Sequence, residues 1–455
     1  MLPYSPLHYL LFSKELEVLV MTSANLNGMP IISDNKKAIN DLANIADYHL
    51  INNRDIYNTV DDSVARIILE EERVIRIGRG YSPMYLKAKK FKESLSLGSH
   101  LKNTFCFCKD ENIILSQYIG DLDNKETLNR YEMDMNTLKN IYNIEPKLIA
   151  YDFHPNIFSN EYLKKFKVKK VGVYPDHAHI ASVLFENKVK RRVIGVAYDG
   201  AGYGEDGTVW GGEFLIADCK EFKRCGHLNL VAMPGGDKAA IDPMRMAISY
   251  FYKVYKDKIQ SKLKDISNYN KALFTESKET KIYIEMIRKD INSPKTSSMG
   301  RLFDAVACIL GFNKRNTFEG EAAIYLENIA LENNTDSYEY GIDFINENYI
   351  INTDAIIIGI AKDLKRQISK EAISMKFHNT IINFTVDVCE KLSKDYGIKE
   401  VALSGGVFQN KILIKGIYNA LEKKSFSVYI NKKIPCNDEG ISLGQLVIAN
   451  EREMD

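Results

Sequence analysis

The sequence predicts an α/β protein with a duplicated core. Two stretches in which an apolar, strand-like run meets glycine, at 97–104 and 193–204, each lead into further α/β sequence, and a third such turn lies at 401–410. Glycine at the end of a strand lets backbone N–H groups approach an anionic group, because no Cβ stands in the way. The recurring pattern therefore indicates nucleotide chemistry in a cleft between two similar halves.

The N-terminal residues 1–90 predict a mixed α/β region with few strands. The run 17–21 is strand-like and is followed by small polar residues. The stretch 85–93 is basic and shows no strong periodicity, so we expect a linker there. Because so few strands precede the first glycine stretch, we expect the region to hold only part of a domain.

The first glycine stretch belongs to a predicted β-hairpin. Its strands are the runs 95–108 and 113–118, and the polar residues 109–112 form the turn. Cys106 and Cys108 stand two apart in the first run, so their side chains point to the same face. The sequence offers no second cysteine pair nearby to complete a four-ligand zinc site, so both are expected to be ordinary buried cysteines.

The second glycine stretch predicts another hairpin, followed by a helix-rich region. The hairpin strands are the runs 192–198 and 213–217. The helix-rich region covers about residues 234–335, and Asp304 interrupts an apolar helical stripe within it. A buried carboxylate is costly unless it is paired or bound to a ligand, so Asp304 is a candidate binding residue. The run 319–321 is expected to begin a helix, where carboxylates favour the positive end of the dipole.

Composition excludes several classes of protein. The 455 residues include 61 Lys and Arg against 60 Asp and Glu, and a net charge of +1 gives no general attraction to nucleic acid or to an anionic membrane. No apolar run approaches the ~20 residues of a membrane-spanning helix. The seven cysteines are scattered, which fits reduced thiols better than a disulfide framework. The N-terminal sequence shows no basic and apolar leader, so we expect a cytoplasmic protein.

The region from residue 94 onward resembles the hydrogenase-maturation carbamoyltransferases of the HypF family and, more broadly, the TsaD-like carbamoyl and threonylcarbamoyl transferases. The matching motifs occur in the family's order, at 98–104, 116–121, 152–155, 177–182, 198–212, 297–307, 319–323, 377–380, 404–410 and 437–445. The resemblance implies a duplicated actin-like (ASKHA, TsaD-like) domain over 91–455, with a helical insertion at about 234–335.

Residues 1–90 resemble the end of the YrdC-like domain of the same family. The match rests on 2–8, 22–28 and 79–81. Full-length members carry an acylphosphatase-like domain, paired cysteine zinc motifs and the first half of the YrdC-like domain upstream, and the sequence shows none of these. We therefore expect a partial YrdC-like domain at 1–90, and a separately encoded N-terminal HypF half is one candidate partner.

The resemblance also implies a divalent metal, of the iron type or zinc. In the family, two histidines four apart share a helix face and hold the ion with carboxylates from later loops. Pro175 stands at the first histidine position, where it supplies no ligand and is expected to end a helix, so we expect weakened metal binding. Asp176 or His177 could substitute from a shifted backbone. The implied metal ligands are His177, His179, Asp199 and Asp438, of which the last three are also the expected catalytic groups.

For the nucleotide, the resemblance implies ATP or carbamoyl-adenylate, with Mg²⁺. The matching positions are Gly200, Gly202 and Gly204 in the phosphate loop, Gly405 and Gly406 in the adenosine turn, Asn410 on the next helix, and Gly300 and Asp304 near the ribose. Lys102 is either a point charge for phosphate or a solvated hairpin lysine. His154 and His378 match family motifs, but we expect both to be structural hydrogen-bonding residues.

The activity that the resemblance implies is transfer of a carbamoyl group from carbamoyl-adenylate to the C-terminal cysteine of a HypE-like acceptor protein. The product is the precursor of the cyanide ligands of nickel-iron hydrogenase. Two alternatives stay open from the sequence: an O-carbamoyltransferase acting on a small metabolite, and a truncated subunit or remnant that needs a separate N-terminal half. No nucleic-acid or membrane partner is expected.

Overall fold

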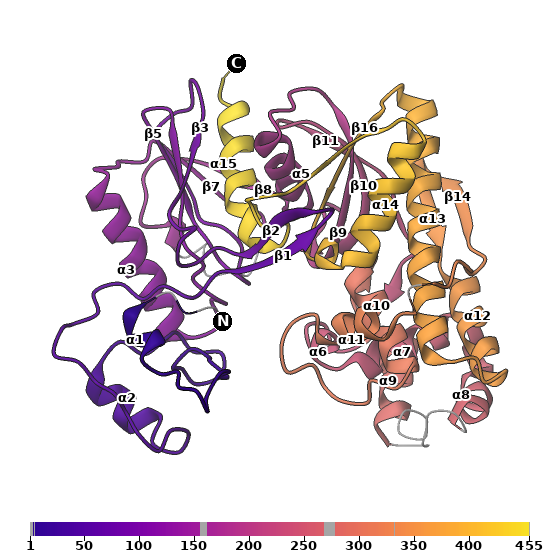
Figure 1. The fold of residues 1–455 in the computed structure, drawn as a ribbon. Coiled ribbons are helices and arrows are strands. Elements are labelled where there is room, and N and C mark those ends of the chain that lie inside the picture. The colour runs from indigo at the N-terminus through magenta and orange to yellow at the C-terminus, as the bar shows by residue number, and fades with distance from the viewer. Residues whose placement is uncertain (1–2, 4, 155–161, 268–277, 332, 455) are drawn as a thin grey trace.

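Two large β-sheets with helices around them form the protein (Figure 1). The computed structural model describes residues 3, 5–154, 162–267, 278–331 and 333–454. The first sheet, in the strand order β3-β6-β5-β4-β7-β8, contains β3 (Met84–Lys87), β4 (Ser94–Ser96), β5 (Cys106–Lys109), β6 (Asn112–Leu115), β7 (Leu148–Asp152) and β8 (Lys169–Val173). The second, in the order β14-β15-β11-β10-β9-β16-β17, contains β9 (Val193–Tyr203), β10 (Val209–Ala217), β11 (Phe222–Leu228), β14 (Gly341–Ile345), β15 (Asn348–Asn352), β16 (Glu400–Ser404) and β17 (Ser427–Ile430), with the short β12 (Val231–Ala232) and β13 (Lys295–Thr296) beside it.

The two sheets repeat one topology, which confirms the duplicated α/β core. In the first sheet β4, β5 and β6 form an antiparallel meander, and β7 and β8 extend it in parallel beyond β4. In the second sheet β9, β10 and β11 form the same meander, and β16 and β17 extend it in parallel beyond β9. Five strands of each sheet, β6-β5-β4-β7-β8 and β11-β10-β9-β16-β17, therefore follow the same order.

Helices cover both faces of the first sheet. Phe105 and Phe107 pack with Tyr131 of α3 (Lys125–Ile141) in one apolar cluster. Cys106 and Cys108 point to the opposite face and pack in a second cluster with residues of α15 (Ile441–Glu451). This alternation confirms that the two cysteines share a face and are buried, and both are free thiols.

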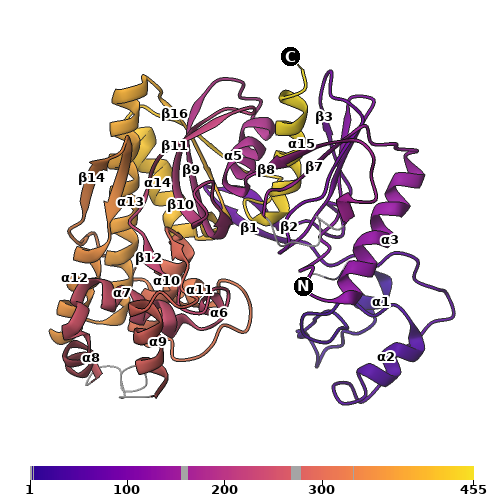
Figure 2. The same ribbon diagram turned by 180° about the vertical axis from the view of Figure 1, so that it is seen from behind.

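A pair of helices, α5 (Pro175–Glu186) and α15, separates the sheets (Figures 1 and 2). α5 lies on β9 and β10 of the second sheet, whereas α15 lies on β4 and β7 of the first. The opposite face of the second sheet is covered by α10 (Met299–Ile309), α13 (Lys370–Tyr396) and α14 (Lys411–Lys423), and α12 (Asp354–Lys365) packs against α13. Residues that begin α5 and precede α15 therefore meet between the two halves.

The remaining elements lie around this core. In the helix-rich stretch the structure has α6 (Lys238–Ile241), α7 (Pro243–Tyr255), η1 (Lys256–Lys258), α8 (Ile259–Ser267), α9 (Lys278–Arg288) and α11 (Glu321–Ile329). The helix predicted to begin at 319–321 is thus confirmed. The N-terminal region holds α1 (Pro6–Tyr9), α2 (Asn35–Asp41) and a hairpin of β1 (Val64–Ile68) and β2 (Glu71–Arg76). Short 3₁₀ turns occur at η2 (Gly406–Gln409) and η3 (Asp438–Gly440).

Three local predictions were wrong. The stretch 85–93 is not simply a linker, because it begins inside β3, which pairs with β6 at the edge of the first sheet. The run 95–108 is not one strand, since the loop 97–105 separates β4 from β5. The run 17–21 forms no strand, and Val18 and Val20 in it are 81% and 98% exposed.

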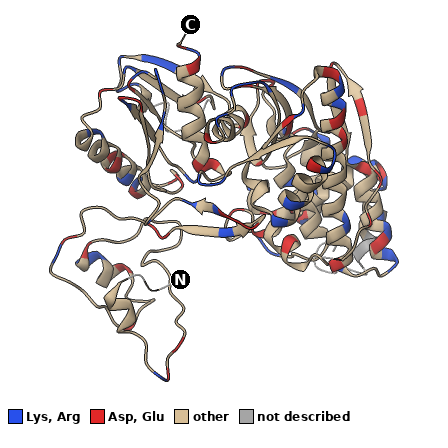
Figure 3. Ribbon diagram, turned by 45° about the horizontal axis from the view of Figure 1, so that its top comes forward, with Lys and Arg blue, Asp and Glu red and all other residues tan. Residues whose placement is uncertain are grey.

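Charge is distributed over the whole molecule, with Lys and Arg interspersed among Asp and Glu (Figure 3). This distribution agrees with the net charge of +1. Among the described residues, no helix combines the length and the apolar character that crossing a bilayer requires.

Candidate functional site

Three predicted site residues converge between the two halves of the core. His179 comes from the start of α5, Asp199 from β9 and Asp438 from η3, just before α15. His179 Nε2 lies 3.5 Å from Asp199 Oδ2 and 3.8 Å from Asp438 Oδ1. One ligand atom from each residue lies within 4.8 Å of the others. The helix pair that separates the sheets thus builds one cluster from distant parts of the chain.

Local backbone features hold Asp199 in place. Its Oδ1 accepts a hydrogen bond from Gly406 N at 3.0 Å, and its carbonyl accepts one from Ser298 Oγ at 2.9 Å. The register of β9 and β10 shifts opposite Asp199, at Gly211, where φ is +136° and a Cβ would lie 2.6 Å from Asp199 O. Such a bulge re-aims neighbouring side chains, so glycine at 211 lets the strand present Asp199 to the cluster.

Burial and charge set the protonation of the two carboxyl groups differently. Burial opposes the ionised form of Asp199, but His179 and the N–H groups of Gly200 and Gly406 outweigh it and lower the pKa of Asp199 to about 2. Burial, together with the neighbouring carboxylates of Asp199 and Glu319, raises the pKa of Asp438 well above its ordinary value. Ionising both carboxyl groups at once is therefore unfavourable unless a cation offsets their charge.

The residues present fit a divalent cation. His179 is 1% exposed, and within the described part of the chain neither of its ring nitrogens has a hydrogen-bond partner. A buried imidazole without partners is costly, and its nitrogen faces two carboxylate oxygens. Imidazole with carboxylates suits zinc, iron and manganese. His179, Asp199 and Asp438 are therefore the residues that would hold the ion.

His177 does not join this cluster. Its Nε2 lies 2.8 Å from Asp218 O and its ring packs on Phe222, so the expectation that it ligates the same ion is corrected. Side chains two apart on a helix point roughly 200° apart, which sends His177 and His179 to different sides of α5. Pro175 does not end a helix, since it occupies the first turn of α5, where its missing N–H costs no hydrogen bond.

Asp176, in the first turn of α5, lies against Gly202 of β9. Both of its carboxylate oxygens are buried, and neither has a hydrogen-bond partner in the described ranges of the chain. Burial and the nearby carboxylates of Glu213 and Asp199 raise its pKa well above the ordinary value. A Cβ at Gly202 would lie 2.7 Å from Asp176 Oδ2, so glycine at 202 makes room for this carboxyl group.

Of the three glycines expected to form a phosphate loop, two lie within a strand, and the third opens the turn between β9 and β10. β9 continues through Gly200 and Gly202 to Tyr203, and Gly204 follows directly. A Cβ at Gly204 would overlap the ring of Trp210, at 2.0 Å from its Nε1. Glycine inside a strand often marks a close approach of another group, and packing explains Gly202 and Gly204 here.

Gly300 and Gly405 allow two backbone segments to approach β9 closely beside the cluster. A Cβ at Gly300 would lie 2.9 Å from Gly200 Cα, so the first turn of α10 rests directly on β9. Gly405 has φ +105°, and a Cβ there would lie 2.3 Å from Tyr198 O. The predicted order of strand, glycine turn and helix at 401–410 is confirmed by β16, η2 and α14.

Asp304 is paired within its own helix. Arg301 Nε donates to Asp304 Oδ2 at 2.7 Å, and both residues are at most 5% exposed. Asn316 Nδ2 donates to Asp304 Oδ1 at 3.5 Å. Burial raises the pKa of Asp304 despite these donors. The carboxylate is thus compensated by the protein itself, and a role at a ribose stays a prediction.

Asn410 already uses its side chain within the protein. Its oxygen caps α14 by accepting from Ile412 N and Leu413 N, each at 3.0 Å. Its nitrogen lies 2.9 Å from His378 Nε2, and His378 Nδ1 lies 2.8 Å from Ser374 O. This network confirms a structural hydrogen-bonding role for His378. It gives Asn410 a role that differs from the expected base or sugar contact.

Lys102 faces the cluster rather than bulk solvent. Its partner there, Glu319, was not predicted as a site residue from the sequence. The Lys102 ammonium forms an ion pair with Glu319 and its side chain is 23% exposed. Burial opposes its charge, but Glu319 and Asp438 outweigh this and raise the pKa of Lys102. Glu319 therefore links the helix-rich stretch to the first half of the core. Its place beside Gly320 in a matched motif was the only signal for it.

His154 lies in the loop after β7, where its N–H donates to Asp152 Oδ1 at 3.0 Å and its ring packs edge-on against Tyr203. Asp152 is 6% exposed, and burial raises its pKa to about 6. Pro155, the last residue of the matched motif at this point, lies outside the described residues.

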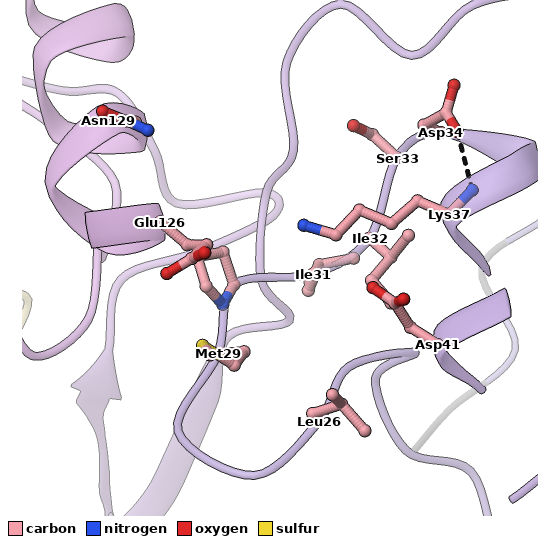
Figure 4. A pocket seen from close by; sticks show the side chains of 11 residues that line it. Leu26, Met29, Ile31, Ile32, Ser33, Asp34, Lys37, Asp41, Glu126 and Asn129 are labelled. Atoms are coloured by element: carbon pink, nitrogen blue, oxygen red, sulfur yellow. Dashed lines mark hydrogen bonds between the residues drawn. The ribbon is translucent and has the colours of Figure 1, made fainter. Parts of the chain in front are cut away.

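A cavity of 390 Å³ lies apart from the cluster, between residues 26–41 and α3 (Figure 4). Leu26, Met29, Ile31 and Ile32 supply apolar lining, and Lys37 lies across from Glu126. None of the residues that line it is a predicted site residue.

A duplicated α/β core with a buried histidine and two carboxylates between its halves defines a transferase domain of the Kae1-like class. The family model described as "Carbamoyltransferase, Kae1-like Domain, second subdomain" matches residues 195–445, and "HypF Kae1-like domain" matches 89–186. A YrdC-containing family model, described as "Telomere recombination", matches 1–78. The chain belongs to the HypF family of carbamoyltransferases.

Individual relatives agree with this assignment. The chain is 35% identical to "Carbamoyltransferase HypF" of Synechocystis sp., over 98% of this chain and 59% of the relative. It is 35% identical to "Probable carbamoyltransferase HypF" of Methanocaldococcus jannaschii, over 98% and 58%. A crystal structure of full-length HypF "in the phosphate- and nucleotide-bound form" superposes with a TM-score of 0.93 at 40% identity, covering 100% of this chain and 71% of that one. The chain thus spans about three fifths of the curated relatives.

Proposed function

We propose that this chain transfers a carbamoyl group from carbamoyl-adenylate to the C-terminal cysteine of a HypE-like acceptor during nickel-iron hydrogenase maturation. The observation that carries the proposal is the buried cluster of His179, Asp199 and Asp438 between the two halves of the core. Membership of a family whose relatives are named carbamoyltransferases supports it. No feature of the cluster favours a small metabolite as acceptor instead.

An adenine nucleotide would lie beside the cluster, against the backbone turns. One solved relative is described as phosphate- and nucleotide-bound, which supports nucleotide binding here. Gly406 N–H already donates to Asp199, so this turn joins the glycine backbone to the cation site. The positions that we propose around the nucleotide are Lys102, Gly200, Gly300, Asp304, Gly405 and Gly406. Lys102 would add a positive charge near the phosphate.

A divalent cation held at the cluster would polarise the carbamoyl carbonyl or the phosphate and stabilise the charge that develops there. Asp199 and Asp438 orient toward the position of such an ion, and His179 completes a set of one nitrogen and two oxygens. Metal of the iron type or zinc fits these donors, and Mg²⁺ would accompany ATP. Because Pro175 offers no ligand, we propose weaker binding than a site with a fourth protein ligand would give.

The transfer itself replaces one bond at the carbamoyl carbon by another. The acceptor thiol loses its proton, and its sulfur attacks the carbonyl carbon of the mixed anhydride. The bond from that carbon to the phosphate oxygen breaks, so that S-carbamoyl cysteine forms and AMP leaves. The chain's own residues hold the adenylate still and exclude water, which keeps the anhydride from hydrolysis. None of the seven cysteines of the chain is required as the nucleophile.

We further propose a YrdC-like region over 1–90 and a TsaD-like domain over 91–455, with its helical insertion at about 234–335. The match of the YrdC-containing model to 1–78 supports this division. Carbamoyl-adenylate formation is assigned to the YrdC-like part, with ATP and carbamoyl phosphate as its sources. A HypE-like acceptor and a separately encoded N-terminal half are the proposed partners, and the cytoplasm is the proposed location.

Intact-mass spectrometry of the acceptor tests the proposal. The chain is incubated with ATP, carbamoyl phosphate and a HypE-type acceptor, in the presence and absence of the N-terminal region of a longer relative. We expect the acceptor to gain one carbamoyl group when that region is present. Asp199→Asn should abolish the gain, whereas Asp343→Asn, on an exposed strand far from the cluster in sequence, should not. An acceptor that stays unmodified under both conditions would refute the proposed activity.

A further inference from the structure

We propose that the β1–β2 hairpin positions Asp438 by clamping residues on both sides of it, which couples the cation site to the N-terminal region. This inference rests on the proposed cation site and assigns positioning residues to it. The hairpin lies within the segment matched by the YrdC-containing model, whereas Asp438 lies within the segment matched by the second Kae1-like subdomain. Figure 1 shows β1 and β2 between the two sheets, next to the start of α15.

The clamp begins where β2 meets the loop that leads from β17 to η3. Val74 N donates to Lys432 O at 3.0 Å, and Arg73 Nη1 donates to Asn431 O at 2.9 Å. Lys432 Nζ also forms an ion pair with Glu71 at 2.8 Å. β2 is therefore tied to this loop by backbone and side-chain contacts before the loop reaches Asp438.

The residues that flank Asp438 complete the clamp. Asn437 Nδ2 donates to Ile75 O at 2.9 Å, and Asn437 Oδ1 accepts from Glu439 N at 3.1 Å. Glu439 Oε2 accepts from Ile77 N at 2.8 Å. The chain is thus fixed one residue before and one residue after Asp438.

The flanking contacts are buried, so water cannot replace them. Asn437 and Glu439 are 2% and 1% exposed. Val74 and Ile77 pack with Ile434 in an apolar cluster that includes residues of α15. Loss of the Glu439 carboxyl group would leave the Ile77 N–H buried without a partner, which costs about 1–3 kcal/mol.

The three consecutive residues 437–439 make different contacts and have different roles. Asn437 contacts Ile75 in β2 and Glu439 contacts Ile77 directly after it, whereas the carboxylate of Asp438 lies 3.8 Å from His179 Nε2. A shift of β2 therefore moves Asp438 relative to His179, which is anchored separately in α5. Outer contacts that orient ligands typically change metal affinity by about 10-fold to 100-fold when they are removed.

A second contact of the same hairpin provides a matched control. Arg66, on β1, donates to Gln409 O at 3.1 Å and forms an ion pair with Glu327 at 3.0 Å. It joins the hairpin to the second half of the core but does not touch the loop that carries Asp438. Arg66→Ala should loosen the hairpin and leave the clamp intact.

Cobalt binding and hydrogen exchange together test the clamp. The variants are Glu439→Ala and Asn437→Ser, which each remove one contact to β2, and Glu439→Gln, which keeps an oxygen for Ile77 N–H. Serine at 437 still accepts from Glu439 N, so it preserves the cap of η3. We expect cobalt affinity to fall about 10-fold or more in the first two variants, with a changed d–d absorption spectrum, and to recover in Glu439→Gln. Amide exchange over 431–440 should accelerate in the same two variants and stay unchanged in Arg66→Ala.

The two readouts separate failure of the clamp from failure of the proposed cation site. Wild-type affinity and spectrum in Glu439→Ala and Asn437→Ser would overturn the clamp. So would an equal loss in Arg66→Ala, because it would show general loosening of the hairpin. A wild-type chain that takes up no cobalt would refute the cation site. The clamp would then be tested by hydrogen exchange alone, and unchanged exchange over 431–440 in Glu439→Ala and Asn437→Ser would overturn it.

Discussion

His179 Nε2 lies 3.5 Å from Asp199 Oδ2, and neither ring nitrogen of His179 has a hydrogen-bond partner among the residues that the structure describes. The separation is too long for a good hydrogen bond. Ligand atoms that share an ion at about 2.0–2.2 Å lie no more than about 4 Å apart, so the pair is spaced as two ligands of one cation. Asp438, at 3.8 Å from the same nitrogen, satisfies the same condition.

Pro175→His should strengthen metal binding. Pro175 lies four residues before His179 in the first turn of α5, so a side chain there shares its helix face. A fourth ligand should raise the affinity for cobalt or zinc about 10-fold or more, measured by equilibrium dialysis under anaerobic conditions. Pro175→Ala is the control for loss of the proline ring. Equal metal affinities in Pro175→His and Pro175→Ala would show that a side chain at position 175 does not reach the ion.

Asp304→Asn should weaken nucleotide binding if the carboxylate approaches a ribose. Calorimetric titration with AMP or ATP and a divalent cation measures the effect. The same variant leaves Arg301 buried without its counter-charge, which should lower the free energy of unfolding by about 3 kcal/mol. The titrations must therefore be made under conditions in which both the wild-type chain and Asp304→Asn are folded. Asp343→Asn is the control variant. Unchanged nucleotide affinity in folded Asp304→Asn would remove this residue from the site.

Gly405→Ala should destabilise the protein far more than Gly397→Ala. Both glycines have positive φ, but a Cβ at Gly405 would lie 2.3 Å from Tyr198 O, whereas Gly397 has nothing within 4 Å. We expect the free energy of unfolding to fall by about 3 kcal/mol or more at 405 and by about 1 kcal/mol at 397. Denaturant unfolding measures both values, and similar losses would argue against close packing of the turn on β9.

His378 should make stability depend on pH between about 6.5 and 4. Burial lowers its pKa from 6.5 to about 4, outweighing the hydrogen bond to Ser374 O. The unfolded state therefore binds the proton first as pH falls, so stability is complete above 6.5 and is lost toward pH 4. The full effect is at most about 3 kcal/mol. Denaturant unfolding of His378→Gln should show a flatter pH profile than wild type, and parallel profiles would contradict this.

Local sequence patterns predicted the parts of the fold that depend on neighbours in the chain. The glycine turn at 401–410 formed as predicted, and the hairpin at 192–217 formed with longer strands than predicted, because strand alternation and glycine positions are local. The stretch 85–93 predicts a linker because it is basic and lacks strong periodicity, whereas β3 depends on pairing with β6, which is not local. The run 17–21 has strand composition, but the described residues supply no paired strand, and a strand needs one.

The candidate site was predictable to a similar degree. The family motifs predicted His179, Asp199 and Asp438 as metal ligands. In the structure these three residues lie close together. The sequence could not show that α5 begins at Pro175, which fixes the different directions of His177 and His179. Nor could it show which glycines serve packing, because the neighbours of Gly202 and Gly204 are set by tertiary contacts.

Anaerobic cobalt titration of the wild-type chain and of His179→Ala tests the cation site most directly. His179 is buried, and its ring nitrogens have no hydrogen-bond partner among the described residues, so alanine removes a metal ligand without breaking a hydrogen bond of the ring. We predict one saturable site in the wild type, of modest affinity because Pro175 supplies no ligand, and no saturable binding in His179→Ala. A tightly held full equivalent of metal that survives His179→Ala would contradict the site and the proposed chemistry built on it.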